Sequence, residues 1–379
     1  MRRCISTFRS LLGASVWLAM LCVAACGQAD AVPQPPAQVI VADTGGPISE
    51  WLLQIGDDSP PEFLQTQAAL IASTPSSVRF RVSFGSASSN DAFLEELQRR
   101  GVRPEGRVSM LQTTGRHYPW LRDLFVTGVA TDGAPLALLN HPHHLGALEG
   151  APSHQHTIGI VQALGAGRLI QTSLRLEGGS VVADSERAFL SRTNGLLAVR
   201  AGQYADLTEF ERAAQELWGT PVTLISTADA DRAEHLDLLM MPIGDRRVVV
   251  SNPSLALRLL GGLRDKDMAR FERDARTMAS QAQETNGIRN VLRMDLLGAL
   301  RTESSEPRRL WAFDQIRREL TAAGYELVDV PFLSIDPARS GARVAFSYTN
   351  VVQDERDGTR TVYMPTYRLP ALDDHAAKD

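Results

Sequence analysis

The stretch His-Leu-Asp-Leu-Leu-Met-Met at residues 235–241 joins two ionisable side chains to an apolar run. The run predicts a strand over 236–241, and on a strand residues two apart point to the same face. We therefore expect His235 and Asp237 to lie side by side. A neighbouring carboxylate orients a histidine and raises its pKa, which suits proton transfer. The alternative for His235 is an ordinary core histidine with a hydrogen-bonded neighbour.

Three other short motifs accompany this stretch in one order along the chain. They are Trp120-Leu121-Arg122-Asp123, Glu177-Gly178-Gly179 and Ser347-Tyr348-Thr349-Asn350, the last followed by a strand-like run at 361–365. Each motif alone is common, since an Arg-Asp step can be a surface ion pair and a Gly-Gly step often marks only a bend. All of them together in this order are much less common.

Two of these motifs supply carboxylates suited to a planar cation. A guanidinium presents its N–H donors as a fork, and a carboxylate can accept two of them at once. Asp123 and Asp237 are the candidates for such a pair of acceptors.

The motifs, over about residues 111–369, resemble those of the guanidine-modifying enzyme superfamily, which includes agmatine deiminases and bacterial peptidylarginine deiminases. The resemblance implies an α/β (α+β) fold, a pentein-like propeller of ββαβ modules around a central site. It gives Asp123 and Asp237 the role of binding the guanidinium and His235 that of proton shuttle. Glu177 matches a carboxylate that supports the histidine. Trp120 and Asn350 complete the predicted substrate-binding set, although a tryptophan would equally fill the core.

The nucleophile that the resemblance implies has no counterpart in the printed sequence. Family enzymes attack the guanidinium carbon with a cysteine near the C-terminus, and water resolves the thiouronium intermediate. The three cysteines, Cys4, Cys22 and Cys26, all lie near the start, and the sequence stops at Asp379. We therefore expect an incomplete last module and no turnover by the 379-residue form. A truncated reading frame is our favoured explanation, and a pseudoenzyme that keeps a guanidinium cradle is the other.

The predicted function is a deiminase-like hydrolase for the guanidino group of arginine, agmatine or peptidyl-arginine, without a cofactor. The alternative is a surface-anchored, non-catalytic binding protein for guanidino ligands or arginine-containing peptides. A third possibility is an exported α/β protein whose motif matches are coincidental. The net charge is -5 and nothing in the sequence resembles a basic nucleic-acid-binding face, so no nucleic-acid partner is expected. The oligomeric state stays open.

The first residues have the layout of an export signal. Three arginines precede an apolar run, 11–23, that is short for a membrane span, and small residues follow it. The run 21–26 resembles a bacterial lipobox, which implies cleavage after residue 25, acylation of Cys26 and anchoring at a periplasmic or cell-surface membrane face. An uncleaved anchor helix is the alternative. Residues 27–36 are small, polar and proline-rich, which predicts that residues 26–46 form the lipidated cysteine and a flexible linker before a globular body at 47–379.

Short strands and helices alternate along the body, which favours an α/β or α+β fold. Helices are predicted at 62–71, at 92–100 with Asn90 as N-cap, and at 208–218, and a charged helical insertion at about 254–324. The strand-like runs are 51–55, 78–82, 107–112, 121–130, 135–139, 222–225, 236–241, 247–251, 326–330, 344–350 and 361–365.

Five histidines gather in a Pro- and Gly-rich stretch that predicts a loop, and His-x-His pairs can ligate a divalent metal. They are His141, His143, His144, His154 and His156. No carboxylate pattern accompanies them, so we expect solvated histidines and no metal site.

Overall fold

The computed structural model describes residues 39–40, 43, 46–56, 59, 61–113, 121–139, 154–172, 174, 178–227, 235–281, 295–335, 344–367 and 369–378. All of them belong to a body that begins at Ala37, before the start at residue 47 expected from composition. The difference arises because β1 (Val39–Ile40), in the predicted linker, pairs antiparallel with β5. No helix among the described residues is long and apolar enough to cross a membrane.

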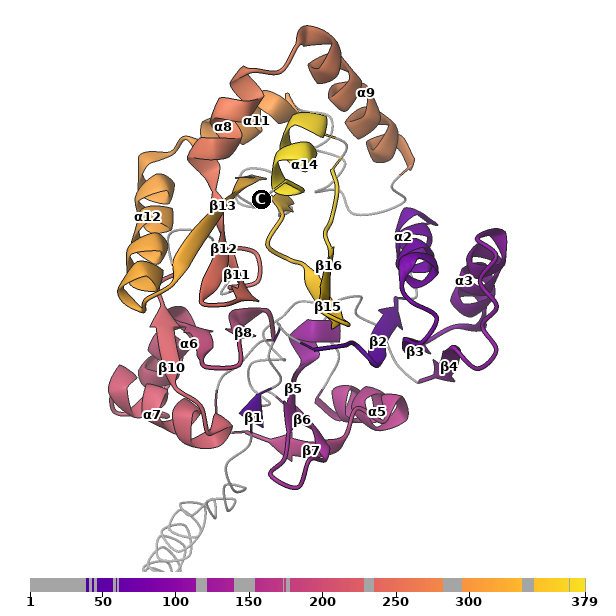
Figure 1. Ribbon diagram of the computed structural model, residues 1–379, viewed down its shortest axis with the longest axis vertical. Coiled ribbons are helices and arrows are strands. Elements are labelled where there is room, and N and C mark those ends of the chain that lie inside the picture. The colour runs from indigo at the N-terminus through magenta and orange to yellow at the C-terminus, as the bar shows by residue number, and fades with distance from the viewer. Residues whose placement is uncertain are drawn as a thin grey trace, which may run out of the picture. The chain divides into compact units, whose positions relative to one another are not determined.

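One topology recurs three times along the body: two antiparallel strands, one or more helices, and a strand parallel to the second (Figure 1). This is the predicted ββαβ module. The first comprises β5 (Phe125–Val129), β6 (Pro135–Leu139), α5 (His154–Leu164) and β7 (Arg168–Gln171). The second comprises β8 (Val181–Ala183), β9 (Ala188–Ser191), α6 (Arg192–Arg200), α7 (Leu207–Trp218) and β10 (Val222–Ile225). The third begins with β11 (Met240–Gly244) and β12 (Arg247–Asn252) and ends with β13 (Glu326–Ile335).

Four helices described between β12 and β13 lie in the region where a helical insertion was predicted, at about 254–324. The helices are α8 (Pro253–Gly261), α9 (Asp265–Gln281), α11 (Leu296–Ser304) and α12 (Pro307–Ala322). Asn252 begins the insertion, because its side chain accepts a hydrogen bond from the Leu255 amide and Pro253 suits the first helical position. Leucines and Phe271 bury their side chains in a cluster with β13 and the C-terminal helix α14 (Pro370–Ala376).

The chain's first sheet is parallel and contains β2 (Glu50–Ile55), β3 (Arg79–Phe84) and β4 (Val108–Gln112), linked by α2 (Pro61–Ser73) and α3 (Ala87–Arg99). Ser86 caps α3 by accepting from the Ser89 amide, so the prediction of Asn90 as N-cap was wrong: Asn90 lies inside the helix. Ser86 is the cap because it stands where the backbone is still extended, as a capping residue must.

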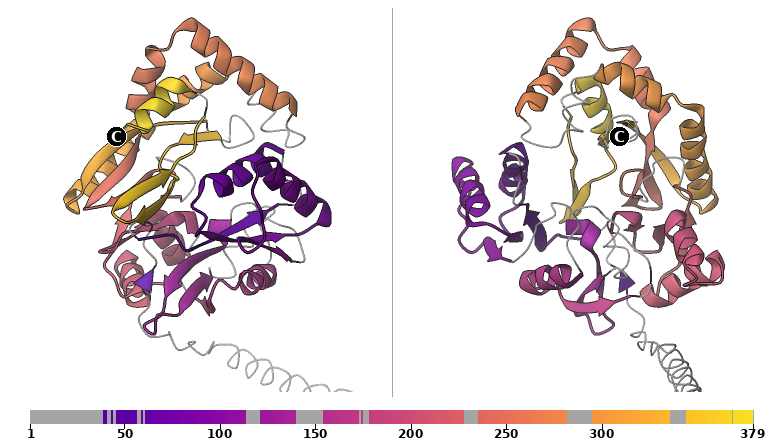
Figure 2. Two further views of the ribbon diagram at one scale, coloured as in Figure 1. Left: turned by 45° about the vertical axis from the view of Figure 1, so that its right-hand side comes forward. Right: turned by 180° about the vertical axis from the view of Figure 1, so that it is seen from behind.

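A hairpin from the end of the chain, β15 (Val352–Arg356) and β16 (Thr359–Tyr363), lies against this first sheet (Figures 1 and 2). Buried Asp354 accepts a hydrogen bond from the Ile48 amide at 2.7 Å, and Arg356 donates to the Ile48 carbonyl. Trp51 of β2 meets Tyr363 of β16 edge-on, with ring centroids 5.8 Å apart. These contacts join the last hairpin to the first sheet.

Several predicted strands have different bounds in the structure, and β13 extends to Ile335, beyond the predicted 326–330. The run 121–130 begins as the 3-10 helix η1 (Leu121–Leu124), and only β5 is extended. Residues 236–239 form a turn before β11, so the predicted strand at 236–241 was wrong over most of its length. β14 (Val344–Ser347) ends before Asn350, and β14 pairs with β13.

Candidate functional site

The described motif residues lie in turns immediately before β5, β8 and β11, the first strands of the three modules, and before β15 of the last hairpin. In chain order these turns contain Arg122-Asp123 in η1 before β5, Gly178-Gly179 in η2 (Gly178–Ser180) before β8, His235 and Asp237 before β11, and Thr349-Asn350 before β15. Equivalent positions in repeated modules explain why short motifs far apart in the sequence meet in the fold. Each motif contacts the next.

The first and second motifs meet at Gly178. The Arg122 Nε donates to the Gly178 carbonyl at 3.4 Å, and the Arg122 Nη2 donates to the carbonyl of Val181 at 2.8 Å. A Cβ added at Gly178 would collide with the backbone carbonyl of Arg122. Glycine is required here by close backbone approach, which is a more specific reason than a bend.

The second and third motifs meet at Gly179. A Cβ at Gly179 would overlap the His235 imidazole, with Cε1 at 2.8 Å. The Gly179 carbonyl accepts a hydrogen bond from the Asp237 amide at 3.1 Å. The missing side chain therefore gives the histidine its place, and the backbone of the same residue holds the aspartate.

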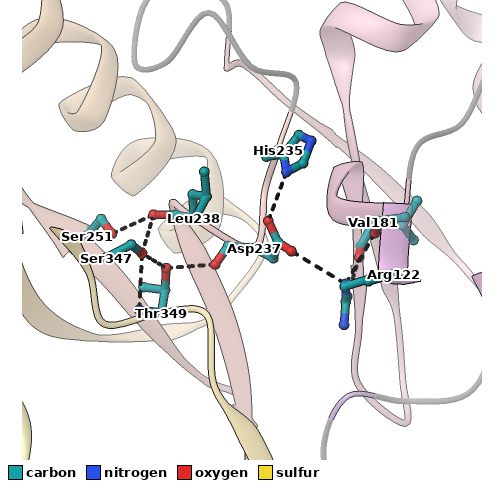
Figure 3. Close-up of polar contacts among 9 residues, drawn as sticks. Arg122, Val181, His235, Asp237, Leu238, Ser251, Ser347 and Thr349 are labelled. Atoms are coloured by element: carbon teal, nitrogen blue, oxygen red, sulfur yellow. Dashed lines mark hydrogen bonds and ion pairs between the residues drawn. The ribbon is translucent and has the colours of Figure 1, made fainter. Parts of the chain in front are cut away.

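The third and fourth motifs meet through hydroxyl groups (Figure 3). The Thr349 hydroxyl donates to the Asp237 carbonyl at 2.9 Å, and the Ser347 hydroxyl to the Leu238 carbonyl at 2.8 Å. Ser251, at the end of β12, donates to the same Leu238 carbonyl at 2.9 Å. These bonds satisfy carbonyls that the turn leaves without strand partners.

His235 and Asp237 are neighbours, as predicted, but for a different reason. The turn, and not a shared strand face, brings His235 Nδ1 to 3.5 Å from Asp237 Oδ1. The Asp237 side chain is 4% exposed and that of His235 is 18% exposed. Asp237 Oδ1 has no hydrogen-bond donor within normal distance among the described residues. A buried carboxylate with spare acceptor capacity can accept a further donor.

Arg122 supplies the positive charge at the site. Its Nε lies 3.5 Å from Asp237 Oδ2, and its Nη1 donates to Asp43 at 2.8 Å. Burial opposes the charged form, but the carboxylates of Asp43, Asp237 and Asp123 outweigh it and raise the pKa of Arg122 above its ordinary value. The guanidinium therefore stays charged. Asp237 lies between Arg122 on one side and His235 on the other (Figure 3).

The other predicted site residues differ in burial, and some lie outside the described residues. Asp123 is buried, at 5% exposure, beside Arg122 in η1, whereas Asn350 is exposed after β14. Glu177, Trp120 and Cys26 lie outside the described residues, and their roles stay predictions.

The histidine-rich stretch is only partly a loop. His154 and His156 belong to α5, so the loop prediction was wrong for them, and His141, His143 and His144 lie outside the described residues. Within the described part of the chain, no cluster of histidine, cysteine or acidic side chains could hold a metal ion.

Sequence reasoning missed Asp43 and Ser251. Asp43 falls in a stretch whose composition predicts a linker, and Ser251 is one polar residue at the end of an apolar strand. Neither position has a local signal, because Asp43 contacts a residue 79 positions away and Ser251 contacts one 13 positions away.

Solved structures share this arrangement of modules. C. jejuni agmatine deiminase, in a cysteine-to-serine variant with substrate bound, matches with a TM-score of 0.55 at 13% identity, over 84% of this chain and 81% of that one. The fold is that of the agmatine deiminases. A second structure of the C. jejuni enzyme matches at a TM-score of 0.53, 13% identity, and 85% and 81% coverage. A Streptococcus protein provisionally assigned as an agmatine deiminase matches at 0.50, 14% identity, and 83% and 81% coverage.

No family model and no curated protein sequence matches the chain. The agmatine deiminase fold is thus established by structure, and the chemistry of the site has to be argued from its own residues.

Proposed function

We propose that the chain binds a guanidino group, from arginine, agmatine or peptidyl-arginine, at Asp237 and Asp123. The observation that carries the proposal is the state of Asp237: it is almost fully buried, and its Oδ1 lacks a hydrogen-bond donor among the described residues. Leaving a buried acceptor unpaired destabilises a folded chain, so such a group commonly marks a functional site. A forked cationic donor is the ligand that suits it best.

The neighbouring groups support the same ligand. Asp123 is a second buried carboxylate on the turn that carries Arg122, and two carboxylates favour a cation over a neutral ligand. His235 lies 3.5 Å from Asp237, which supports a proposed role in exchanging a proton with a bound guanidino group. The C. jejuni agmatine deiminase with substrate bound has the same fold, which is consistent with a guanidino ligand.

The proposed family chemistry is hydrolysis of a C–N bond of the guanidino group by a deiminase. That reaction would need a nucleophile at the guanidinium carbon, and the printed sequence has no cysteine after Cys26. We therefore propose that the 379-residue form binds without turnover. The alternative of a non-catalytic, surface-anchored binding protein rests on the same carboxylates and predicts the same behaviour.

Calorimetric titration of the full chain with agmatine, arginine and an arginyl peptide tests the proposal. Putrescine is the matched ligand control, since it has amines and no guanidinium. We expect saturable binding of at least one guanidino ligand and loss of binding in Asp237→Asn. Asp314→Asn, an exposed aspartate on α12, should bind normally. Equal binding of putrescine, or no binding of any guanidino ligand, would contradict the proposal.

An ammonia-release assay on the same samples separates the two functions. No ammonia from agmatine, arginine or the peptide is the result expected for the 379-residue form. Ammonia production that Asp237→Asn abolishes would show that this form is an active deiminase with another nucleophile.

We also propose that the chain is an exported lipoprotein anchored through Cys26. The support is the charged, apolar and small-residue order of residues 1–26. Metabolic labelling with a fatty-acid probe should mark the wild type and Cys22→Ala but not Cys26→Ala. Equal labelling of both variants would rule out Cys26 as the acylated residue.

A further inference from the structure

Asp43, near the start of the body, contacts the candidate site. Its amide donates to the Ala183 carbonyl and its Oδ2 accepts from the Ala183 amide, both at 2.8 Å. Its Oδ1 accepts from Arg122 Nη1, also at 2.8 Å. Both oxygens are used at short distance, and the side chain is 19% exposed. Asp43 is therefore held by β8 and in turn holds Arg122.

The N–H groups of Arg122 face Asp43 and Val181 on one side and Asp237 on the other. The Nη1 and Nη2 atoms bind Asp43 and the Val181 carbonyl at 2.8 Å, whereas Nε is only 3.5 Å from Asp237 Oδ2. An unrestrained guanidinium would turn its fork to the buried carboxylate, because a bidentate pair is the stronger contact. In the observed orientation the guanidinium instead donates to Asp43 and to the carbonyls of Val181 and Gly178.

We propose that Asp43 is a positioning residue that holds Arg122 away from full contact with Asp237, so that Asp237 keeps its acceptor capacity for an external guanidinium. This inference rests on the proposed function of Asp237. Without Asp43, the chain's own guanidinium would compete with the ligand for the same oxygens. The first residues of the body thus act on the site.

A double-mutant cycle tests this proposal in the full chain. Asp43→Asn should weaken agmatine binding about tenfold, within the usual range for contacting residues. In an Arg122→Gln background, the same substitution should have no further effect, since Asp43 acts through Arg122. Asp132→Asn, which alters an exposed Asp–Arg pair at 3.9 Å, is the matched control and should leave binding unchanged in both backgrounds.

Equal weakening by Asp43→Asn in both backgrounds, or none in the wild type, would overturn the proposal. Hydrogen exchange at the Asp237 amide, which bonds the Gly179 carbonyl, gives a second readout that needs no ligand. The exchange rate of this amide should change when Asp43→Asn is introduced into the wild-type chain, but not when it is introduced into Arg122→Gln. If the wild type binds no guanidino ligand, the proposed function fails, while unchanged exchange means that the positioning role fails.

Discussion

Asp237, at the candidate site, and Asp354, where the last hairpin meets the first sheet, are buried carboxylates in similar settings. They are 3% and 2% exposed, and each has an arginine beside it. Asp354 accepts short hydrogen bonds from the Ile48 amide at 2.7 Å and from Arg356 Nε at 2.8 Å. Asp237 has Arg122 and His235 as its neighbours, each at 3.5 Å. The same side chain is thus fully paired where it joins modules and underpaired where the motifs meet.

The difference separates a structural carboxylate from a functional one. A paired carboxylate stabilises the fold, because its burial is offset by good hydrogen bonds. An underpaired carboxylate stabilises less, and its retention is better explained by a ligand that supplies the missing donors. Substitution of Asp354 should therefore mainly lower stability, and substitution of Asp237 should mainly weaken ligand binding.

Asp354→Asn tests the structural half and has the largest expected effect. Removing this charge leaves Arg356 without its carboxylate and weakens the link to Ile48, so the free energy of unfolding should fall by about 3 kcal/mol. Asp237→Asn should change it by about 1 kcal/mol or less, since Arg122 and His235 both lie at the long distance of 3.5 Å from this carboxylate. Urea denaturation of both variants, with Asp314→Asn as reference, measures the difference. Equal losses for the two would remove the distinction.

Gly179→Ala tests whether the site depends on close packing of glycine against His235. The added Cβ would overlap the imidazole, so we expect a loss of about 1–3 kcal/mol of stability together with loss of ligand binding. Gly159→Ala, inside α5, is the matched control: nothing lies within 4 Å of its Cβ. It should be neutral or stabilise by up to about 1 kcal/mol, because alanine favours the helix. Circular dichroism melts and calorimetry measure both quantities.

If Gly179→Ala has the stability and the ligand binding of the wild type, His235 can move aside without consequence. The glycine would then be a bend, as its sequence alone also allowed, and the contact with His235 would carry no weight in the site.

The sequence predicted the modules and the motif residues better than the geometry that unites them. Apolar periodicity gave strands at 51–55, 222–225 and 247–251 close to their observed bounds, because local patterns determine such elements. It failed at 236–241, where Leu236 and Leu239 are apolar because they fill the core from a turn. No sequence repeat marks the modules, since only topology is repeated.

Long-range contacts account for what could not be foreseen. Asp43 and Arg122 are 79 positions apart and Asp354 and Ile48 are 306 apart, so no local pattern encodes either pair. The short motifs were found from their order and resemblance, and their shared place before each module's first strand appeared only with the fold.

Thr349→Val tests how far the hydrogen bond to the Asp237 carbonyl supports the site. The valine removes the hydroxyl that donates to the Asp237 carbonyl, and Thr349 is fully buried. We expect a loss of about 1–2 kcal/mol in the free energy of unfolding and weaker ligand binding, because the turn that carries Asp237 loses its anchor. Thr349→Ser keeps the hydroxyl and should restore binding. If Thr349→Val binds as the wild type does, the hydroxyl contacts are structural only.

Tyr367 gives the smallest effect, a change in the pH dependence of stability. Burial is the main cause that raises its pKa to about 12, and Asp373 adds to it. A tyrosine with a raised pKa in the fold stabilises fully below the unfolded value of 10.0, and this contribution is lost as pH rises from there to about 12. Tyr367→Phe should therefore lose less stability over that range than the wild type does. Urea midpoints of both proteins, measured on both sides of pH 10, test this. Parallel curves would mean that Tyr367 does not titrate with unfolding. Buried Tyr348 and Tyr325, whose pKa values are also raised, would then account for the loss of stability.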